Sequence, residues 1–201
     1  MKFNAILQDF VEAQLAVGNV TALMGDAGIG KSSFALALAK RMSTKAFVLP
    51  CNQLGDKTDL TGARLLKIDD RYQQAFFPHE VIDEAIQYAE DNPRETPILV
   101  LDEINRTSSD VTSAILTVIT LMRVGRREIP KNLKLVITGN IKGNVTALDE
   151  ASISRFVIIE VEPDANTLIK VLSDAGTLHP YVEQAITAKP DTIFSRVEGQ
   201  S

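Results

Sequence analysis

Residues 25–33 read GDAGIGKSS, and this stretch decides the fold. It follows an apolar run at 20–24 and leads into a helical pattern at 31–42. Four of its residues fit the spacing G-x-x-x-x-G-K-[ST], in which a glycine-rich turn joins a strand to a helix and encloses phosphate. The matching residues are Gly25, Gly30, Lys31 and Ser32. The stretch therefore predicts a phosphate-binding loop at the end of a β-strand.

Each residue type in this loop has a physical purpose. Glycines permit backbone conformations that point successive N–H groups at an anion. The N-terminus of the following helix adds partial positive charge. Lys31 would reach the β- and γ-phosphates, and the Ser32 hydroxyl would ligate Mg²⁺. The alternative is a glycine-rich turn with an incidental lysine. We predict ATP and Mg²⁺ as ligands, with a nucleotide-binding set of Gly25, Asp26, Ala27, Gly28, Ile29, Gly30, Lys31, Ser32 and Ser33.

Outward from the loop, short apolar strands alternate with helical patterns, which predicts an α/β fold with a parallel sheet. The expected strands are 20–24, 46–50, 97–102, 133–139 and 156–161. The expected helices are 31–42, 80–91, 109–122 and 147–154, followed after Pro163 by two shorter ones at 164–175 and 180–188. Ser109 is the expected N-cap of the helix at 109–122. An N-terminal helix is expected to pack on the core through Phe3, Ile6, Leu7, Phe10 and Val11.

Polar side chains end two of the expected strands. Asp102 and Glu103 close the run PILVLDE, and Asn140 closes LVITGN. The carboxyl ends of parallel strands are where ligands bind in open sheets. Asp102 suits a second Mg²⁺ ligand, and Glu103 suits the residue that polarises a water for attack on the γ-phosphate. Asn140 would hydrogen-bond a phosphate oxygen and that water. Ordinary strand-end charges and a turn-forming Gly-Asn are the alternatives.

The composition excludes several classes of protein. A net charge of −5 over 201 residues gives no general affinity for nucleic acid. One cysteine, Cys51, excludes an intrachain disulfide framework and fits a cytoplasmic protein. A bacterium, or a phage in a bacterial host, as the source is a separate expectation that the composition does not test. No apolar run approaches the length that spans a membrane. Cys51 is expected to be packed in the core, and His79 and His179 to be surface or capping residues.

The ordered motifs GDAGIGKS, LDEINR, TGN and SRF resemble those of the AAA+ ATPases over about residues 1–165. LDEINR, together with VGRREIPKNLKLVITGN and DKTDLTGARLL, resembles the MoxR and dynein-related branch. The resemblance implies a three-layer P-loop NTPase sandwich whose five-stranded parallel sheet has the order 5-1-4-3-2. It also implies assembly into a ring, commonly a hexamer, that couples ATP hydrolysis to remodelling of a protein or a protein–nucleic acid complex.

Arg155, in SRF, stands where that family has its arginine finger. The resemblance implies that it reaches the γ-phosphate held by a neighbouring subunit. An arginine finger contributes about 10³–10⁵ in rate, whereas a surface ion pair is worth about 0–1 kcal/mol. A local salt bridge is therefore an alternative that experiment can separate from the catalytic one.

Two segments match insertions that members of this branch carry. Residues 62–79 would be one insertion, with Phe76 and Phe77 as substrate contacts, although core packing of both phenylalanines is an alternative. Residues 123–132 would form a hairpin, with a solvated loop as the alternative to a partner surface. The candidate contacts to DNA or to an acidic protein are Arg123, Arg126 and Arg127. Relatives of this branch often work with von Willebrand factor A-domain proteins, so such a partner is expected.

The chain is expected to divide into an ATPase core at 1–163 and a short or truncated helical lid at 164–201, with Arg196 as the late candidate for a lid arginine. The short lid leaves open an ATP-binding switch or assembly subunit with little turnover of its own. A third possibility is GTP dependence, because GTP-dependent restriction subunits share the run DEINR.

Overall fold

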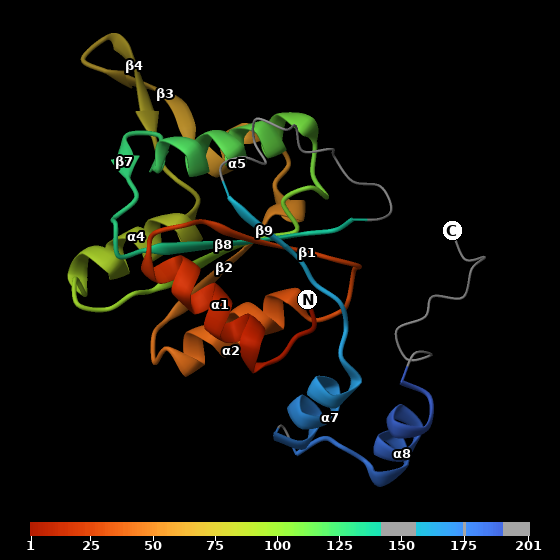
Figure 1. Ribbon diagram of the computed structural model, residues 1–201. Helices are drawn as coiled ribbons and strands as arrows, with labels where there is room; N and C mark the ends of the chain where they lie inside the picture. Colours follow the sequence, from red (N-terminus) through yellow and green to blue (C-terminus); the bar gives the residue numbers. More distant parts are fainter. Residues whose placement is uncertain (142–155, 175, 191–201) are drawn as a thin grey trace.

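The computed structural model describes residues 1–141, 156–174 and 176–190 (Figure 1). Its centre is a five-stranded parallel sheet in the order β2-β5-β8-β1-β9. The strands are β1 (Thr21–Met24), β2 (Ala46–Pro50), β5 (Ile98–Asp102), β8 (Lys134–Gly139) and β9 (Val157–Glu160). Counted along the chain within this sheet, the order is 5-1-4-3-2, which confirms the predicted fold.

Helices cover both faces of the sheet and make three layers (Figure 1). α1 (Ala5–Ala16) and α2 (Lys31–Arg41) pack on one face, where they meet Ile98 and Val100 of β5. α4 (Glu80–Asp91) and α5 (Ser109–Leu121) pack on the other face, where they meet Leu99 and Leu101. Because alternate residues of β5 enter opposite cores, its sequence is apolar throughout.

The N-terminal helix forms as predicted, but its buried face is narrower. Leu7, Val11 and Leu15 are fully buried at a spacing of four residues. The prediction was wrong for Ile6 and Phe10, which are 68% and 38% exposed. Each of these precedes a buried residue by one position, so it points about 100° away around the helix. Their apolar character did not indicate contact with the sheet.

Capping residues set the starts of three helices. Ser108, and not the predicted Ser109, caps α5: its side chain accepts a hydrogen bond from the backbone N–H of Val111. His79 caps α4 and His179 caps α8 (Pro180–Ala188), each through its Nδ1 atom at 3.3 Å from a backbone nitrogen. The expected capping role of both histidines is confirmed.

Two antiparallel hairpins interrupt the alternation of strands and helices. β3 (Ala63–Ile68) and β4 (Arg71–Phe76) form the first, which projects from the molecule beside α5 (Figure 1). It follows η1 (Cys51–Gln53) and α3 (Lys57–Thr61). β6 (Arg123–Val124) and β7 (Arg127–Glu128) form the second, between α5 and β8. These are the two segments predicted as insertions. Cys51 is buried, as expected.

α7 (Ala165–Asp174) and α8 follow the sheet and extend away from it (Figure 1). The N-terminal residues contact the start of α7. Lys2 pairs with Asp164 at 3.7 Å, and the Thr167 hydroxyl donates to the carbonyl of Phe3. The helix expected at 147–154 and Arg196 lie outside the described residues. Within the described residues, no helix has the length and apolar character to cross a bilayer.

Candidate functional site

The predicted phosphate-binding loop joins β1 to α2 at the carboxyl edge of the sheet. Gly28 and Gly30 adopt left-handed backbone conformations, with φ of 79° and 97°. A Cβ atom at either position would meet nothing within 4 Å, so these positions need glycine for conformation rather than for space. Gly25 is different: a Cβ there would lie 2.6 Å from the carbonyl oxygen of Val161. Ala27 and Ile29 are half-buried, and Ser33 is exposed.

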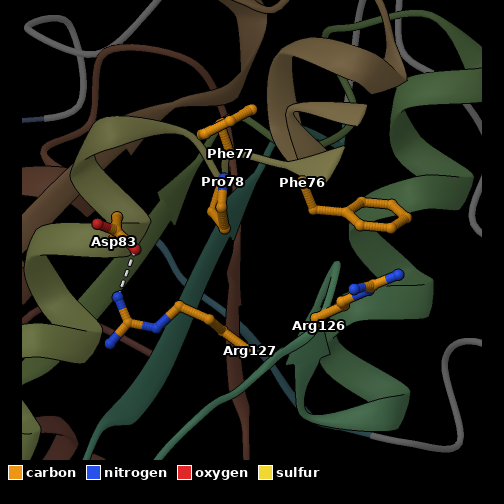
Figure 2. A pocket seen from close by; sticks show the side chains of 6 residues that line it. All are labelled: Phe76, Phe77, Pro78, Asp83, Arg126 and Arg127. Carbon is orange, nitrogen blue, oxygen red and sulfur yellow. Dashed lines mark hydrogen bonds and ion pairs between the residues drawn. The ribbon is translucent and has the colours of Figure 1, made fainter. Parts of the chain in front are cut away.

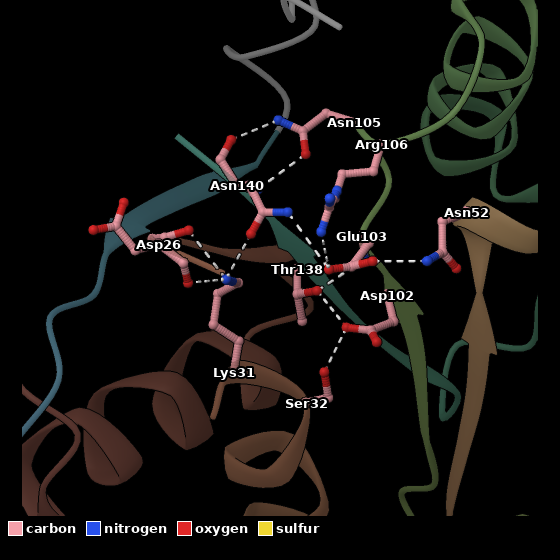
Figure 3. Close-up of polar contacts among 11 residues, drawn as sticks. Asp26, Lys31, Ser32, Asn52, Asp102, Glu103, Asn105, Arg106, Thr138 and Asn140 are labelled. Carbon is pink, nitrogen blue, oxygen red and sulfur yellow. Dashed lines mark hydrogen bonds and ion pairs between the residues drawn. The ribbon is translucent and has the colours of Figure 1, made fainter. Parts of the chain in front are cut away.

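Lys31, the first residue of α2, is buried and folds back over the loop (Figure 3). Its Nζ donates to the backbone oxygens of Gly25, at 3.0 Å, and Asp26, at 2.7 Å. It also donates to Oδ1 of Asn140 at 3.0 Å. Burial lowers the pKa of Lys31 below the ordinary 10.5, while the nearby carboxylates, Glu103 foremost, act against that shift.

Ser32 and Asp102, the two predicted metal ligands, are in direct contact. The Ser32 hydroxyl donates to Oδ1 of Asp102 at 2.6 Å. Thr138, buried on β8, donates its hydroxyl hydrogen to the same carboxylate oxygen. A hydroxyl beside a carboxylate fits Mg²⁺, which prefers hard oxygen ligands and takes few of them from the protein when phosphates supply the rest. Among the described residues, no group of three or more acidic, histidine or cysteine side chains offers a competing metal site.

Glu103 adopts a left-handed conformation, with φ of 55°. Its backbone N–H, its backbone carbonyl and its carboxylate all take part in hydrogen bonds. Its backbone N–H donates to the hydroxyl of Thr138 at 3.0 Å. Its carboxylate accepts from Asn52 at 2.8 Å and Arg106 at 3.3 Å, and the Nδ2 atom of Asn140 lies 3.5 Å away. Left-handed conformations are uncommon for non-glycine residues and cluster at functional sites.

The structure thus brings together most of the predicted site residues. Arg155 lies outside the described residues. Four further polar residues complete the cluster (Figure 3): Asn52, Thr138, Asn105 and Arg106. Three of them lie inside or directly beside the motifs LDEINR and LVITGN, so the sequence offered a signal for them. Asn52 lies just after β2, whose carboxyl end meets the same edge of the sheet as the other strands.

The two hairpins meet over a depression of about 210 Å³ that is separate from this cluster (Figure 2). Phe77 is 55% exposed and Phe76 half-buried, so core packing does not describe Phe77. The Arg126 guanidinium lies 5.9 Å from the centre of the Phe76 ring. Arg127 pairs with Asp83 at 2.5 Å and with Glu90 at 2.8 Å, which attaches the second hairpin to α4.

Comparison with known proteins agrees with this geometry. Residues 21–156 match the model of the AAA domain, dynein-related subfamily. Over 96 residues, 48% of this chain, the sequence is 32% identical to peroxisomal Lon protease homolog 2 of Oryza sativa subsp. indica and of Zea mays. The chain spans about a tenth of the length of these relatives.

Solved structures share the fold. A protein of Cytophaga hutchinsonii assigned as an ATPase superposes with a TM-score of 0.56 at 17% identity, covering 89% of this chain and 52% of its own. The P216G mutant of Thermotoga maritima RuvB superposes with a TM-score of 0.51 at 19% identity, covering 84% of this chain and 50% of its own. The family match spans more than half of the chain and includes the loop, the acidic pair and Asn140. The chain therefore belongs to the dynein-related subfamily of AAA domains, a branch of the AAA+ ATPases.

Proposed function

We propose that this chain binds ATP with Mg²⁺ and hydrolyses it. One observation carries the proposal: residues from two strand ends and one helix start converge at a single edge of the sheet. Lys31 contacts Asn140, Ser32 contacts Asp102, and Glu103 lies next to Asn140. Each contact joins segments far apart in the sequence, so the cluster depends on the fold. A chance arrangement of strand-end charges does not account for this convergence.

The proposed roles follow from the positions of the side chains. Lys31 donates all three of its N–H bonds to oxygen atoms of the loop and Asn140, and the same donors would bind phosphate oxygens. Glu103, with a carboxylate at the edge of the cluster, would accept the proton of an attacking water. Asn140 would hold that water or a phosphate oxygen through its side-chain amide. Gly25, Gly28 and Gly30 would let backbone N–H groups of the loop face the phosphates.

Mg²⁺, when bound, would neutralise charge on the phosphates. Ser32 and Asp102 would hold it, and Thr138 would orient Asp102, to which it is hydrogen-bonded. The hydroxyl hydrogen that Ser32 gives to Asp102 would turn away to let both oxygens face the ion. The support for this site is the pairing of two hard oxygen donors beside the loop.

We further propose that the chain acts in a ring and remodels a protein or a protein–nucleic acid complex. Membership of the AAA family supports this, and the division into a core at 1–163 and a helical segment at 164–201 belongs to the same proposal. Arg155 would serve the nucleotide of a neighbouring copy. The partner, an acidic or von Willebrand factor A-domain protein or DNA, would meet the two hairpins through Phe77, Arg123 and Arg126. Arg127 is already paired with Asp83 and Glu90 and is the weakest of the three arginine candidates.

Phosphate release from Mg²⁺-ATP, measured across a range of protein concentrations, tests the proposal. We expect the rate per chain to rise with concentration, because the active site needs Arg155 of a second copy. Mixing an Arg155→Ala chain with a Lys31→Ala chain should restore part of the activity that each lacks alone. Mixtures that co-assemble and recover nothing would contradict a shared site. Adding GTP as a competitor for ATP decides between the two nucleotides.

A second candidate function is an ATP-dependent switch with little turnover. The observation in its favour is that donors of the chain itself, Asn52 and Arg106, engage both carboxylate oxygens of Glu103. A base held in this way is not free to accept a proton from water. Under this reading ATP raises the free energy of unfolding by about 2.7 kcal/mol at a hundredfold excess over Kd, while phosphate release stays negligible. Rapid turnover by the chain alone would exclude it.

A further inference from the structure

Asn105 is hydrogen-bonded to both backbone polar groups of Asn140 (Figure 3). Its Nδ2 donates to the carbonyl oxygen of Asn140 at 2.7 Å, and its Oδ1 accepts from the N–H of Asn140 at 3.0 Å. Both residues are buried, with 3% and 2% of their surface exposed. A side-chain amide presents one acceptor and two donors in a plane, so it can replace a peptide group in a strand pair.

This pairing continues the contact between β5 and β8 beyond the end of β5. The backbone register of the two strands ends at Leu101 and Ile137. The loop after β5 then stays attached through the N–H of Ile104, which donates to the carbonyl of Thr138 at 3.1 Å. Asn105 adds the last connection at Asn140. The end of β8 is therefore fixed although its neighbouring strand has already turned away.

Gly139 leaves the space that this connection needs. A Cβ atom at position 139 would lie 3.1 Å from Oδ1 of Asn105 and 2.7 Å from the side chain of Met24. Either neighbour would have to move to admit a methyl group. The close approach of Asn105 to the β8 end thus depends on a residue without a side chain.

The consequence concerns the side chain of Asn140, which lies between Lys31 and Glu103. Its Oδ1 accepts from Nζ of Lys31 at 3.0 Å, and its Nδ2 lies 3.5 Å from the carboxylate of Glu103. Asn105 holds the backbone N–H and the backbone carbonyl of Asn140. The side-chain amide of Asn140 can therefore move only by rotation about its own side-chain bonds. We infer that Asn105 is a positioning residue that orients Asn140 for hydrolysis and has little part in nucleotide binding. The inference rests on the proposed ATPase function.

Steady-state kinetics of Asn105→Ala, Asn140→Ala and the double variant test the inference. We expect Asn105→Ala to lower kcat by about 10- to 100-fold, the scale of a small misplacement in an active site. We expect its KM for ATP to stay within about threefold, because an interaction used only in the transition state changes kcat and not binding. Asn105→Asp keeps the acceptor for the Asn140 N–H but turns a carboxylate oxygen toward the Asn140 carbonyl oxygen in place of the Nδ2 donor, so it should be at least as slow as Asn105→Ala.

The double variant separates positioning from general damage to the fold. If Asn105 acts through Asn140, the double variant should be no slower than Asn140→Ala alone. The inference is overturned if removing Asn105 slows Asn140→Ala by the same factor as it slows the wild type. It is also overturned if Asn105→Ala raises KM as much as it lowers kcat.

Amide hydrogen exchange gives a readout that does not need turnover. The N–H of Asn140 should exchange faster in Asn105→Ala, while the N–H of Ile137, inside the β5–β8 ladder, should keep its protection. An inactive wild type whose Asn140 amide behaves in this way would contradict the proposed ATPase function and leave the Asn105–Asn140 connection supported. Unchanged exchange at Asn140 would overturn the positioning role whether or not the chain hydrolyses ATP.

Discussion

Lys31 and Asn140, 109 positions apart in the sequence, are joined by a 3.0 Å hydrogen bond in the interior of the site. The bond links the start of α2, which follows β1 in the chain, to the end of β8, which pairs with β1 in the sheet. It places the lysine ammonium in a partly desolvated setting, surrounded by carbonyl and amide oxygens. The charge state of Lys31 is therefore sensitive both to burial and to any anion that enters the loop.

This setting predicts how nucleotide binding depends on pH. Burial lowers the pKa of Lys31 below the ordinary 10.5. A bound phosphate would raise that pKa again, so binding takes up protons and the affinity for ATP should fall as the pH rises through the lowered pKa. Titration calorimetry in buffers of different ionisation enthalpy measures the uptake. Lys31→Arg stays charged throughout this range and should show a flatter pH dependence; equal slopes would contradict the role of Lys31.

The same shift affects the stability of the nucleotide-free protein in the opposite direction. Between the lowered pKa of Lys31 and 10.5, the unfolded chain binds more protons at this residue than the folded chain does. The contribution of Lys31 to the free energy of unfolding therefore rises with pH across that window. Urea titrations of the wild type and Lys31→Met at several alkaline pH values isolate this contribution. A contribution from Lys31 that falls with pH would contradict the assigned direction of its pKa shift.

The sequence was sufficient to predict the sheet and the phosphate-binding loop, because both depend on local patterns. The strand β2 was predicted with its exact bounds, and the other sheet strands to within a residue at each end. Asn52 was not predicted as a site residue, because its contact with Glu103 arises from the order of the strands and not from a motif. Ile6 and Phe10 were misassigned because an apolar pattern does not say how wide a face the sheet can cover.

The contact between Asn52 and Glu103 predicts an effect on basal turnover. Asn52→Ala removes a 2.8 Å donor from one carboxylate oxygen and leaves that oxygen free to accept from water. If the bond restrains Glu103, basal phosphate release should rise, by about two- to tenfold for one modest hydrogen bond. Asn132→Ala is the matched control, since the side-chain amide of this asparagine donates to the backbone carbonyls of Ala89, Asn92 and Glu95, in and after the last turn of α4. A fall in kcat with unchanged ATP affinity would show that Asn52 supports Glu103 and does not restrain it.

Gly62 ends α3 in a left-handed conformation, with φ of 61°, and a Cβ there would lie 1.5 Å from the carbonyl oxygen of Phe77. Gly18, with φ of 87°, has nothing within 4 Å of that position. Gly18→Ala should therefore lower the free energy of unfolding by about 1–2 kcal/mol, the cost of a left-handed backbone conformation for a residue with a side chain. Gly62→Ala should lower the free energy of unfolding by at least twice as much, because the backbone at Phe77, at the base of the first hairpin, must also move away from the new methyl group. Urea unfolding of both variants measures the difference, and equal losses would contradict the packing described for Gly62.

Arg127 attaches the second hairpin to α4 through Asp83 and Glu90. Arg127→Ala should lower the free energy of unfolding by about 1 kcal/mol, with a smaller loss at high salt, as for other partly exposed ion pairs. Arg123→Ala, on the same hairpin at an exposed position, should change it by less than about 0.5 kcal/mol. Thermal and urea unfolding at two salt concentrations tests the pair. A larger loss of stability for Arg123→Ala than for Arg127→Ala would contradict the conclusion that Arg127 is the arginine that attaches the second hairpin to α4.

The most direct test of the proposed function compares ATP affinity and turnover in the wild type and Glu103→Gln. The substitution keeps the size of the side chain and removes its ability to take a proton. We expect Glu103→Gln to bind Mg²⁺-ATP within about threefold of the wild type and to lose about 10²- to 10⁴-fold in kcat. A wild type that releases no phosphate at any protein concentration, or a Glu103→Gln chain that turns over at the wild-type rate, would contradict the proposal.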